Sequence, residues 1–378
     1  MKLYYIANAR LPHKKAYAIQ IAKMCEALIE EGVDLELILP KRDARAEELK
    51  EYYHLRTKIR TVWLPVVDVY ARGRWGFFFG SLSFMVSYSL YILLKRLRGE
   101  QGVVYTIDMD TFSFMPIIFL GMPYFLETHG GKAVRWINTT FFRYLRGVIV
   151  INRIIKKQIA EALEFPEDKM LVWPNGIDLD LFKETPKVEA RKKLHISAEA
   201  KIVMYAGRFY GWKGIEVLID AVAMIPADIL VYIVGGTKEE FMAITKKEIV
   251  PNNFVFPGEK PYAEIPAWLS SADALVVLGT KNDTQSYYYT SPMKVFEYLA
   301  MKRPIVASET PAIRDIVSSR EVIFYEPDNA RALAESILLS VSGKAAVDTI
   351  TQAAFVRAHD FTWRKRAHDT IQFIKKNI

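Results

Sequence analysis

The chain has only one cysteine, and this excludes several classes of protein. Cys25 has no second thiol for an intramolecular disulfide, and it offers no cysteine cluster for zinc. The apolar run at Met1 to Ile6 is too short for a secretory signal and predicts a first strand. Short repeats, low-complexity tracts and signatures of nucleic-acid-binding modules are also missing from the sequence. We therefore expect a globular cytoplasmic protein, with attachment to the inner face of the plasma membrane as a further option.

Acidic residues do not balance the basic ones in the first half of the chain. Residues 1–173 contain 25 Lys and Arg against 18 Asp and Glu, whereas residues 174–378 contain 26 against 25. A basic half beside a nearly neutral one indicates an anionic partner for the basic half. Aromatic and aliphatic residues crowd the same half, so an anionic membrane surface is favoured and no nucleic-acid partner is expected.

Charge is absent altogether from Trp75 to Leu94, and basic residues flank this segment on both sides. About 20 apolar residues are enough to cross a bilayer. Serines dilute the segment, however, and strands predicted for one sheet lie on both sides of it. Three interpretations stay open: a membrane-spanning helix, an interfacial helix with basic flanks, and an ordinary buried helix.

Strand-like and helix-like segments alternate through both halves, which predicts an α/β fold of parallel sheets covered by helices. A chain of 378 residues is too long for one compact core, so two domains are expected. The junction is predicted near Trp173-Pro174-Asn175-Gly176, where proline and glycine end a strand. The predicted strands are Leu3–Ala7, Leu35–Leu39, Val103–Ile107, Tyr124–Glu127 and Gly147–Ile151 in the first half, and Ile202–Ala206, Ile229–Val234, Phe254–Phe256, Ala274–Leu278 and Pro304–Ala307 in the second.

A glycine-rich turn follows the first strand of the second half. Gly207 begins it, Arg208 and Lys213 bring two positive charges, and a helix is predicted from Ile215. Backbone N–H groups in such a turn can approach a phosphate, and arginine can contact one with two hydrogen bonds. The alternative is a plain strand–helix turn whose basic residues are solvated.

A second segment runs from Thr290 to Leu299 and predicts another helix. Ser291 suits the N-cap and Pro292 the first helical position. Glu297 falls among apolar neighbours inside the predicted helix. Such a carboxylate is either paired with a local cation such as Lys294 or kept for two hydroxyl donors of a ligand, as a ribose offers.

Taken together, these segments and Pro174-Asn175-Gly176-Ile177-Asp178 resemble glycosyltransferase family four, whose members have the GT-B fold. The resemblance covers nearly the whole chain and is strongest from Pro174 to Ser308. The stretch from Lys15 to Gln20 is similar to a subgroup that acts in surface-polysaccharide and glycolipid assembly. The resemblance implies two facing Rossmann-like domains with a cleft between them: residues 1–173 as the acceptor domain and 174–357 as the donor domain, with the helix 358–378 packing back onto the first.

The resemblance also implies a role for each motif. Arg208 and Lys213 would hold the donor diphosphate, and Glu297 would accept hydrogen bonds from the ribose. His129, at a strand end of the first half, would face the donor sugar across the cleft, although a lone histidine is more often structural. The remaining donor-binding residues would be Gly207, Pro257, Gly258, Lys260, Tyr289, Thr290, Ser291, Pro292 and Lys294. Residues expected at the acceptor or in the cleft are Asn8, Arg10, Asp108, Asn175 and Asp178.

The chain departs from the family's pattern at one position. Members often have two glutamates with seven residues between them, the second matching Glu297, and the first would fall at Tyr289. In the family that carboxylate contacts hydroxyls of the donor sugar, so its absence puts the identity of the sugar in doubt. The tyrosines around this position could equally pack in the cleft without binding sugar.

Asp108 and Asp110 form an Asp-x-Asp pair at a strand end, an arrangement that holds a divalent metal in many glycosyltransferases of another fold. Here the pair lies in the half opposite the phosphate-binding residues, and a loop carboxylate near the acceptor is the favoured interpretation. We expect no metal and no other cofactor.

The family implies transfer with retention of anomeric configuration. No carboxylate can be assigned as a covalent nucleophile, so front-face displacement is favoured, with basic residues stabilising the departing diphosphate. Two other functions stay open: a nucleotide-sugar epimerase of the same fold, which would consume donor without acceptor, and a binding protein without catalysis.

Overall fold

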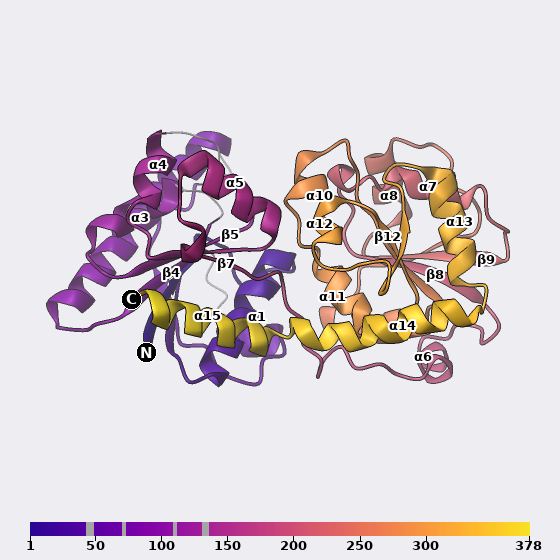
Figure 1. The fold of residues 1–378 in the computed structure, drawn as a ribbon, viewed down its shortest axis with the longest axis horizontal. Coiled ribbons are helices and arrows are strands. Elements are labelled where there is room, and N and C mark those ends of the chain that lie inside the picture. Colours follow the sequence, from indigo (N-terminus) through magenta and orange to yellow (C-terminus); the bar gives the residue numbers. More distant parts are fainter. Residues whose placement is uncertain (43–48, 70–72, 109–111, 131–135) are drawn as a thin grey trace. The chain divides into compact units, whose positions relative to one another are not determined.

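The computed structural model describes the chain except for residues 43–48, 70–72, 109–111 and 131–135. It divides into two compact units, Met1–Pro174 with Trp363–Ile378 and Asn175–Thr362 (Figure 1). We call them the first and the second domain. Asp110 lies outside the described residues, and so does the side chain of Asp108.

The first domain is built on a parallel sheet. Among the described residues it has seven strands in the order β3-β2-β1-β4-β5-β6-β7. The sheet therefore reverses its order between β1 and β4, and ligands of such sheets bind where the strands at this point end. The strands are β1 (Lys2–Ile6), β2 (Asp34–Pro40), β3 (Thr61–Leu64), β4 (Val103–Asp108), β5 (Tyr124–Thr128), β6 (Gly147–Val150) and β7 (Met170–Val172).

Helices cover both faces of this sheet. Figure 1 shows α1 and α15 on one side of it and α4 and α5 on the other. The helix α5 begins where the side chain of Asn152 accepts a hydrogen bond from the backbone of Ile155, which satisfies one of the unpaired N–H groups of its first turn. The helices are α1 (Ala16–Glu30), α2 (Leu49–Tyr52), α3 (Gly73–Leu97), α4 (Trp136–Phe142), α5 (Arg153–Leu163) and α15 (Trp363–Asn377), with 3₁₀ turns η2 (Phe112–Phe119) and η3 (Glu167–Lys169).

The second domain repeats the plan. Its described residues form six parallel strands in the order β10-β9-β8-β11-β12-β13, reversing between β8 and β11. The strands are β8 (Lys201–Ala206), β9 (Ile229–Val234), β10 (Phe254–Gly258), β11 (Ala274–Val277), β12 (Ile305–Ser308) and β13 (Ile323–Tyr325). The helices are α6 (Lys187–Lys193), α7 (Glu216–Val222), α8 (Lys238–Thr245), α9 (Ile265–Ser271), α10 (Thr284–Tyr288), α11 (Met293–Leu299), α12 (Pro311–Arg314), α13 (Ala330–Ser340) and α14 (Ala345–Ala358), with η4 (Gly211–Lys213), η5 (Tyr262–Glu264) and η6 (His359–Phe361).

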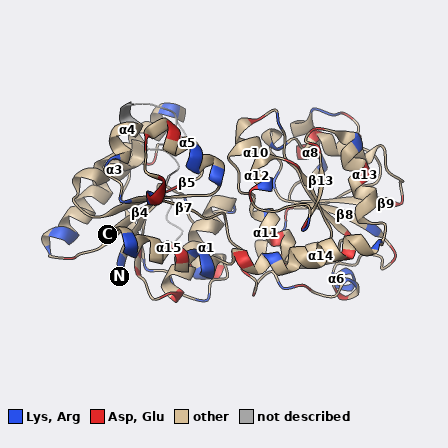
Figure 2. Cartoon of the chain, viewed as in Figure 1, with Lys and Arg blue, Asp and Glu red and all other residues tan. Residues whose placement is uncertain are grey.

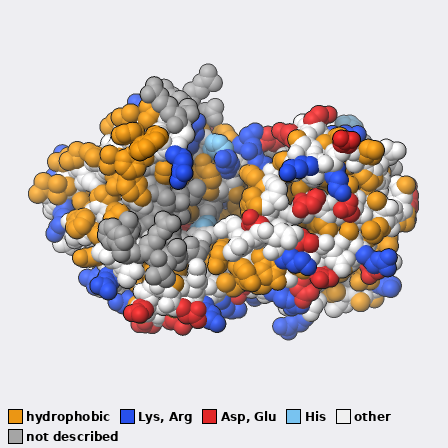
Figure 3. Space-filling view, turned by 90° about the horizontal axis from the view of Figure 1, so that it is seen from above, with side chains coloured by type: hydrophobic (Ala, Val, Ile, Leu, Met, Phe, Trp, Pro, Cys, Tyr) orange, Lys and Arg blue, Asp and Glu red, His pale blue; other side chains and the backbone are white. Residues whose placement is uncertain are grey.

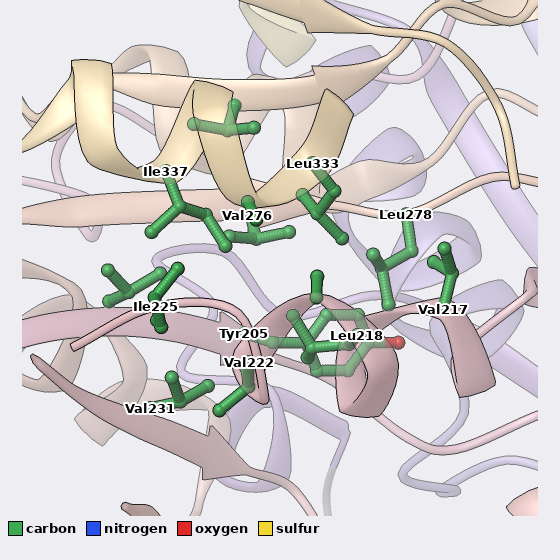
Figure 4. Packing of buried hydrophobic residues seen from close by; sticks show 14 of the residues in the cluster. Tyr205, Val217, Leu218, Val222, Ile225, Val231, Val276, Leu278, Leu333 and Ile337 are labelled. Atoms are coloured by element: carbon green, nitrogen blue, oxygen red, sulfur yellow. The ribbon is translucent and has the colours of Figure 1, made fainter. Parts of the chain in front are cut away.

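One face of the second sheet packs against α7 and α13. Figure 4 shows Leu218 and Val222 of α7 and Leu333 and Ile337 of α13 turned towards strand residues such as Val276. All five are buried, and aliphatic side chains of this size contribute about 1.5–3 kcal/mol each when they leave water. This core fixes the strand ends that carry the glycine-rich turn.

These two parallel-sheet domains confirm the predicted α/β fold class. The helix that returns to the first domain begins later than the expected 358. Ala358 and Phe361 belong to the second domain, where the Phe361 ring packs on Phe296 with centroids 5.1 Å apart. The return starts at Trp363, and α15 then packs against α1.

Candidate donor-binding and catalytic site

Two closely packed glycines follow neighbouring strands, Gly207 after β8 and Gly235 after β9. Gly207 has a φ of 137°, and its N–H donates to the carbonyl of Val234 at 2.7 Å. A Cβ on Gly235 would lie 2.6 Å from the Gly207 carbonyl oxygen, and one on Gly207 would lie 3.0 Å from Lys294 Nζ. Glycine at both positions therefore lets a backbone turn and a lysine ammonium approach each other closely.

Lys294 is a buried cation. Its Nζ lies 3.5 Å above the centre of the Tyr205 ring and makes no hydrogen bond to the described part of the chain. Burial lowers the pKa of Lys294 well below its usual value, the neighbouring charge of Lys213 lowers it further, and Glu297 acts in the opposite direction. A buried ammonium held only by an aromatic face has donors left for an anion.

Lys213 lies in the 3₁₀ turn η4 after the glycine-rich segment. Its Nζ is 4.9 Å from the ring centre of Tyr210 and 5.2 Å from that of Trp212. Burial lowers the pKa of Lys213 to about 8, and the charge of Glu297 opposes this change. The predicted helix follows as α7, whose N-cap is Ile215, so Lys213 itself is presented by the turn before the helix.

Glu297 is the carboxylate of the group, carried by α11. It is 9% exposed, and one of its oxygens accepts a hydrogen bond from the Tyr262 hydroxyl at 3.1 Å. Burial raises the pKa of Glu297 to about 7, although Tyr262, Lys294 and Lys213 all act to lower it. A carboxylate so desolvated still has acceptor positions for hydroxyl donors.

Arg208 is more exposed than Lys294. In this structure its guanidinium makes an ion pair with Glu259, 3.1 Å between nitrogen and oxygen. Because about a third of the arginine side chain is exposed, this contact is a weak surface pair that an anion can replace.

The segment before α11 is arranged differently from the prediction. Ser291 does not cap the helix: the N-cap is Pro292, and no side chain caps it. The hydroxyl of Ser291 instead accepts the Asn175 N–H at 3.1 Å, and the Asn175 amide donates to the Ser291 carbonyl at 2.7 Å. The serine oxygen is thus used to tie the start of the second domain to α11.

The remaining residues expected at the donor lie on three elements. Pro257 and Gly258 are within β10, and Lys260 places its Nζ 5.2 Å from the ring centre of Trp268. Tyr289 follows α10, and its ring packs on Tyr288 with centroids 6.1 Å apart. Thr290 lies between Tyr289 and the Ser291 contact.

Two tyrosines in this group were missed at the sequence level. Tyr262 holds Glu297, and Tyr298 accepts the Ala206 N–H at 2.8 Å, which joins α11 to the end of β8. Tyr298 directly follows Glu297 in the motif, so its position in the sequence indicated that it lies at this site. Tyr262 gives no such indication, because it comes from a distant turn.

In the first domain His129 belongs to a buried polar cluster around Glu127. Its Nε2 donates to a Glu127 oxygen at 2.6 Å, and Gln20 donates to the same oxygen at 2.6 Å. The Tyr105 hydroxyl and the Arg366 guanidinium also donate to this carboxylate, the guanidinium at 2.7 Å. Burial works against the charge, but Arg366 and His129 hold the pKa of Glu127 below its usual value.

This cluster determines how His129 is presented. A carboxylate that receives Nε2–H fixes both the ring orientation and the tautomer of a histidine. His129 is 26% exposed while Glu127 is fully buried, so the ring reaches from the cluster towards solvent. Neither Gln20 nor Arg366 is close to His129 in the sequence, and no sequence pattern paired them with His129, although Gln20 belongs to the stretch similar to the polysaccharide and glycolipid subgroup.

Two of the residues expected at the acceptor lie near the end of β1. The Asn8 amide donates to the Ser81 and Ser113 hydroxyls at 3.0 and 2.9 Å, so it links β1 to α3 and η2. Arg10 is exposed and lies 3.5 Å from Asp68. In the second domain, Asp178 accepts the N–H groups of Asp180 and Leu181 and thereby forms a tight turn.

Within the residues that the structure describes, no group of three or more His, Cys, Asp or Glu is placed to hold a metal ion. This finding does not test the metal role considered for Asp108 and Asp110, because Asp110 and the side chain of Asp108 are not among the described residues.

Comparison with protein families matches both domains. Residues 18–181 match the model described as glycosyltransferase family 4, and residues 186–356 match the one described as glycosyl transferases group 1.

Among curated proteins, the chain is 25% identical over 224 residues to the putative teichuronic acid biosynthesis glycosyltransferase TuaC of Bacillus subtilis. That match covers 57% of this chain and only 54% of the relative's length. It is also 25% identical over 264 residues to the processive diacylglycerol alpha-glucosyltransferase of Acholeplasma laidlawii, covering 62% of this chain and 77% of the relative.

Solved structures share the fold over nearly the whole chain. The sucrose-phosphate synthase of Thermosynechococcus elongatus superposes with a TM-score of 0.78 at 20% identity, covering 99% of this chain and 98% of that one. Anabaena HepE in complex with UDP gives a TM-score of 0.71 at 17% identity, covering 98% and 100%.

Proposed function

Because the chain belongs to glycosyltransferase family four, with the GT-B fold, we propose that it transfers a sugar from a nucleotide-diphosphate sugar to a hydroxyl of a glycan or lipid-linked acceptor. We further propose that it does so in the cytoplasm, at an anionic membrane surface. The lipid-linked acceptor is suggested by the basic, apolar first half of the chain and by the diacylglycerol glucosyltransferase among its relatives.

One observation supports the donor part most strongly: the half-buried Lys213 and the buried Lys294 lie in one electrostatic group with the buried carboxyl of Glu297. The low pKa values mean that the charged forms of these two lysines lack solvation by water. A bound diphosphate would stabilise the charged forms, because its negative charge takes the place of the missing water. Glu297 offers acceptors to the two hydroxyls of a ribose. One nucleoside diphosphate satisfies both needs at once.

The proposed chemistry is front-face displacement with retention. The acceptor oxygen forms a bond to the anomeric carbon, the bond from that carbon to the diphosphate oxygen breaks, and the acceptor proton passes to the departing phosphate. Arg208, Lys213 and Lys294 would stabilise the charge that develops on the leaving group. No metal is needed for this, since three cationic side chains supply the positive charge.

His129 has a positioning or transition-state role in this proposal. The resemblance to the family assigns it to the donor sugar, and the Glu127 cluster supports a fixed ring. Tyr289 stands where many members have a glutamate, so we leave the transferred sugar unassigned.

The test is an assay of donor turnover in the presence of EDTA. UDP-, GDP- and ADP-sugars are each incubated with and without a glycolipid extract, and the released nucleotide and the labelled glycolipid are measured. Transfer that depends on the extract supports the proposal. Donor converted to another nucleotide sugar without the extract would show an epimerase, and nucleotide binding without any turnover would show a binding protein.

A further inference from the structure

The helix α3 exposes its most apolar face. It is long and apolar enough to cross a bilayer. Only 33% of the residues in its most apolar 18-residue stretch are buried within the described part of the protein. The interpretation of this segment as an ordinary buried helix is therefore wrong. Figure 2 shows α3 without charge along its middle, and its residues 73–97 include no aspartate or glutamate.

The polar groups of α3 are directed towards the domain. The Ser81 hydroxyl accepts a hydrogen bond from Asn8, and the Ser87 hydroxyl donates to the Pro65 carbonyl at 2.6 Å. The hydroxyls of Tyr88 and Tyr91 donate to the Ser113 carbonyl and to Glu36. Three of the serines that dilute the segment in the sequence, Ser81, Ser83 and Ser87, thus attach the helix to its own domain.

The apolar side chains form a stripe on the outer side, which we call the α3 stripe. Its members recur every three or four residues, so they follow one face of the helix: Trp75, Phe79, Leu82, Val86, Leu90, Leu93 and Leu97. At 1.5 Å per residue the stripe is about 33 Å long. Trp75 and Leu97 at its two ends are each 74% exposed.

Further aromatic side chains are exposed on α3 and on the neighbouring turn η2. Phe78 is exposed too, and its ring stacks on that of Phe112 with centroids 5.2 Å apart. Phe119, in the turn η2 that packs against α3, is 78% exposed. Figure 3 shows hydrophobic side chains gathered over the part of the first domain that contains α3, at the left of the view.

Exposed basic residues accompany the stripe. Arg74 stands beside Trp75, and Arg96 and Arg98 stand on either side of Leu97. An exposed apolar surface that is rimmed by cations and has no acidic group along the helix fits an anionic lipid surface better than water.

We infer that the α3 stripe inserts into the headgroup region of an anionic phospholipid membrane, with the helix lying in the plane of that membrane. This inference deepens the membrane-surface part of the proposed function and rests on it. A spanning arrangement would separate β3 from β4, which both belong to the first sheet and flank α3 in the chain. A second copy of this chain is the other possible occupant of the stripe, and the test distinguishes it.

The experiment is flotation of the full chain with vesicles of phosphatidylcholine and phosphatidylglycerol, and with vesicles of phosphatidylcholine alone. One variant carries Trp75→Ser, Phe79→Ser and Leu82→Ser. The matched control carries Val188→Ser, Ile249→Ser and Val356→Ser, three exposed apolar residues of the second domain. We expect the stripe variant to bind mixed vesicles about 100-fold more weakly and the control to bind like the native chain.

A second variant tests the charge. The double variant Arg74→Gln and Arg98→Gln should have about a tenfold smaller ratio of affinities for anionic over neutral vesicles. This ratio should then be close to the one that the native chain shows in high salt. In a third measurement, lipids brominated on the acyl chains should quench the fluorescence of the native protein, and Trp75→Phe should remove a large part of that quenching.

Three results would overturn the inference: equal vesicle binding of the stripe variant and the native chain, no binding of the native chain at low salt, or a native dimer that the stripe substitutions convert to a monomer. Nucleotide titration without vesicles separates this failure from failure of the proposed function. A stripe variant that binds nucleotide normally but not vesicles has a folded donor domain.

Discussion

Arg366, in the last helix of the chain, is fully buried and forms an ion pair with Glu127 at the end of β5, with 2.7 Å between nitrogen and oxygen. The same guanidinium donates from Nε to the Pro174 carbonyl at 2.9 Å. The last helix is thereby joined to the strand end that carries His129 and to the last residue of the first domain before the crossover. The C-terminal segment is therefore part of the first domain's buried polar core.

Removing this arginine should destabilise the first domain. Arg366→Leu leaves the buried Glu127 carboxylate beside an apolar leucine side chain. Loss of one partner of a buried ion pair lowers the free energy of unfolding by about 3–5 kcal/mol. Urea unfolding measures the loss. Arg364→Leu is the control: Arg364 is exposed and pairs with Glu31 at the surface, so its loss should cost less than about 1 kcal/mol. Equal losses in the two variants would contradict the structural role of the buried pair.

Replacement of His129 should affect turnover and leave nucleotide binding intact. His129→Asn removes the ring that Glu127 orients, and positioned groups of this kind contribute about 10²–10⁴-fold to rate. We expect transfer to fall about 100-fold at an unchanged affinity for the nucleotide. His195→Asn, at an exposed position in the second domain, should change neither quantity. A normal transfer rate in His129→Asn would make the histidine structural.

Removal of the proposed contacts to the diphosphate should lower the rate constant of sugar transfer. Arg208→Ala and Lys213→Ala each remove a cation proposed to stabilise the leaving group, and loss of one such contact costs about 10²–10³ in rate. Single-turnover transfer of a labelled sugar measures this directly. The control is Arg320→Ala, an exposed arginine elsewhere in the second domain. If Arg208→Ala weakens binding and leaves the rate of bound donor unchanged, its role is binding alone.

Nucleotide affinity should have a maximum near neutral pH. The pKa of Glu297 is raised to about 7, so below that value the carboxyl is protonated and loses acceptors for the ribose. The pKa of Lys213 is lowered to about 8, so above that value the lysine loses its charge and holds the diphosphate less well. The affinity should therefore fall on both sides, by at most about tenfold per pH unit for each group.

Titration calorimetry across this range checks the profile. Glu297→Gln should lack the decrease on the acidic side, and Lys213→Met the decrease on the basic side. A flat profile in the native protein would mean that neither group changes its charge in the free site.

The alternation of apolar runs predicted most of both sheets, because a strand buried on both faces must be nearly all apolar. The predicted strands did not include β3 or β13, and of β7 only the end near Trp173 was predicted. Lys213, Lys294 and Glu297 could be named as donor-binding candidates because they lie in compact motifs, and their role stays a prediction. Tyr262, Gln20 and Arg366 could not be placed in these groups, since only the tertiary fold brings them to Glu297 and Glu127.

One local prediction failed and another question stayed open for a common reason. Ser291 has the chemistry of an N-cap, but Asn175 uses its hydroxyl instead. The serines between Trp75 and Leu94 left three interpretations of the segment open, and the partners of Ser81 and Ser87 in the first domain could not be read from the sequence. In both cases a side chain's partner lies far away in the sequence, and local pattern does not contain that information.

The proposed function depends most on the donor site proposed in the second domain, and a metal-free titration with UDP, GDP and ADP tests that site directly. The native chain is compared with Glu297→Ala and Arg208→Ala, and with Glu335→Ala and Arg320→Ala as exposed controls. We expect one of the three nucleotides to bind without metal, and both site substitutions to weaken it at least about tenfold, which is about 1.4 kcal/mol. Absence of binding without a divalent metal, or equal affinities in all variants, would contradict the proposed site.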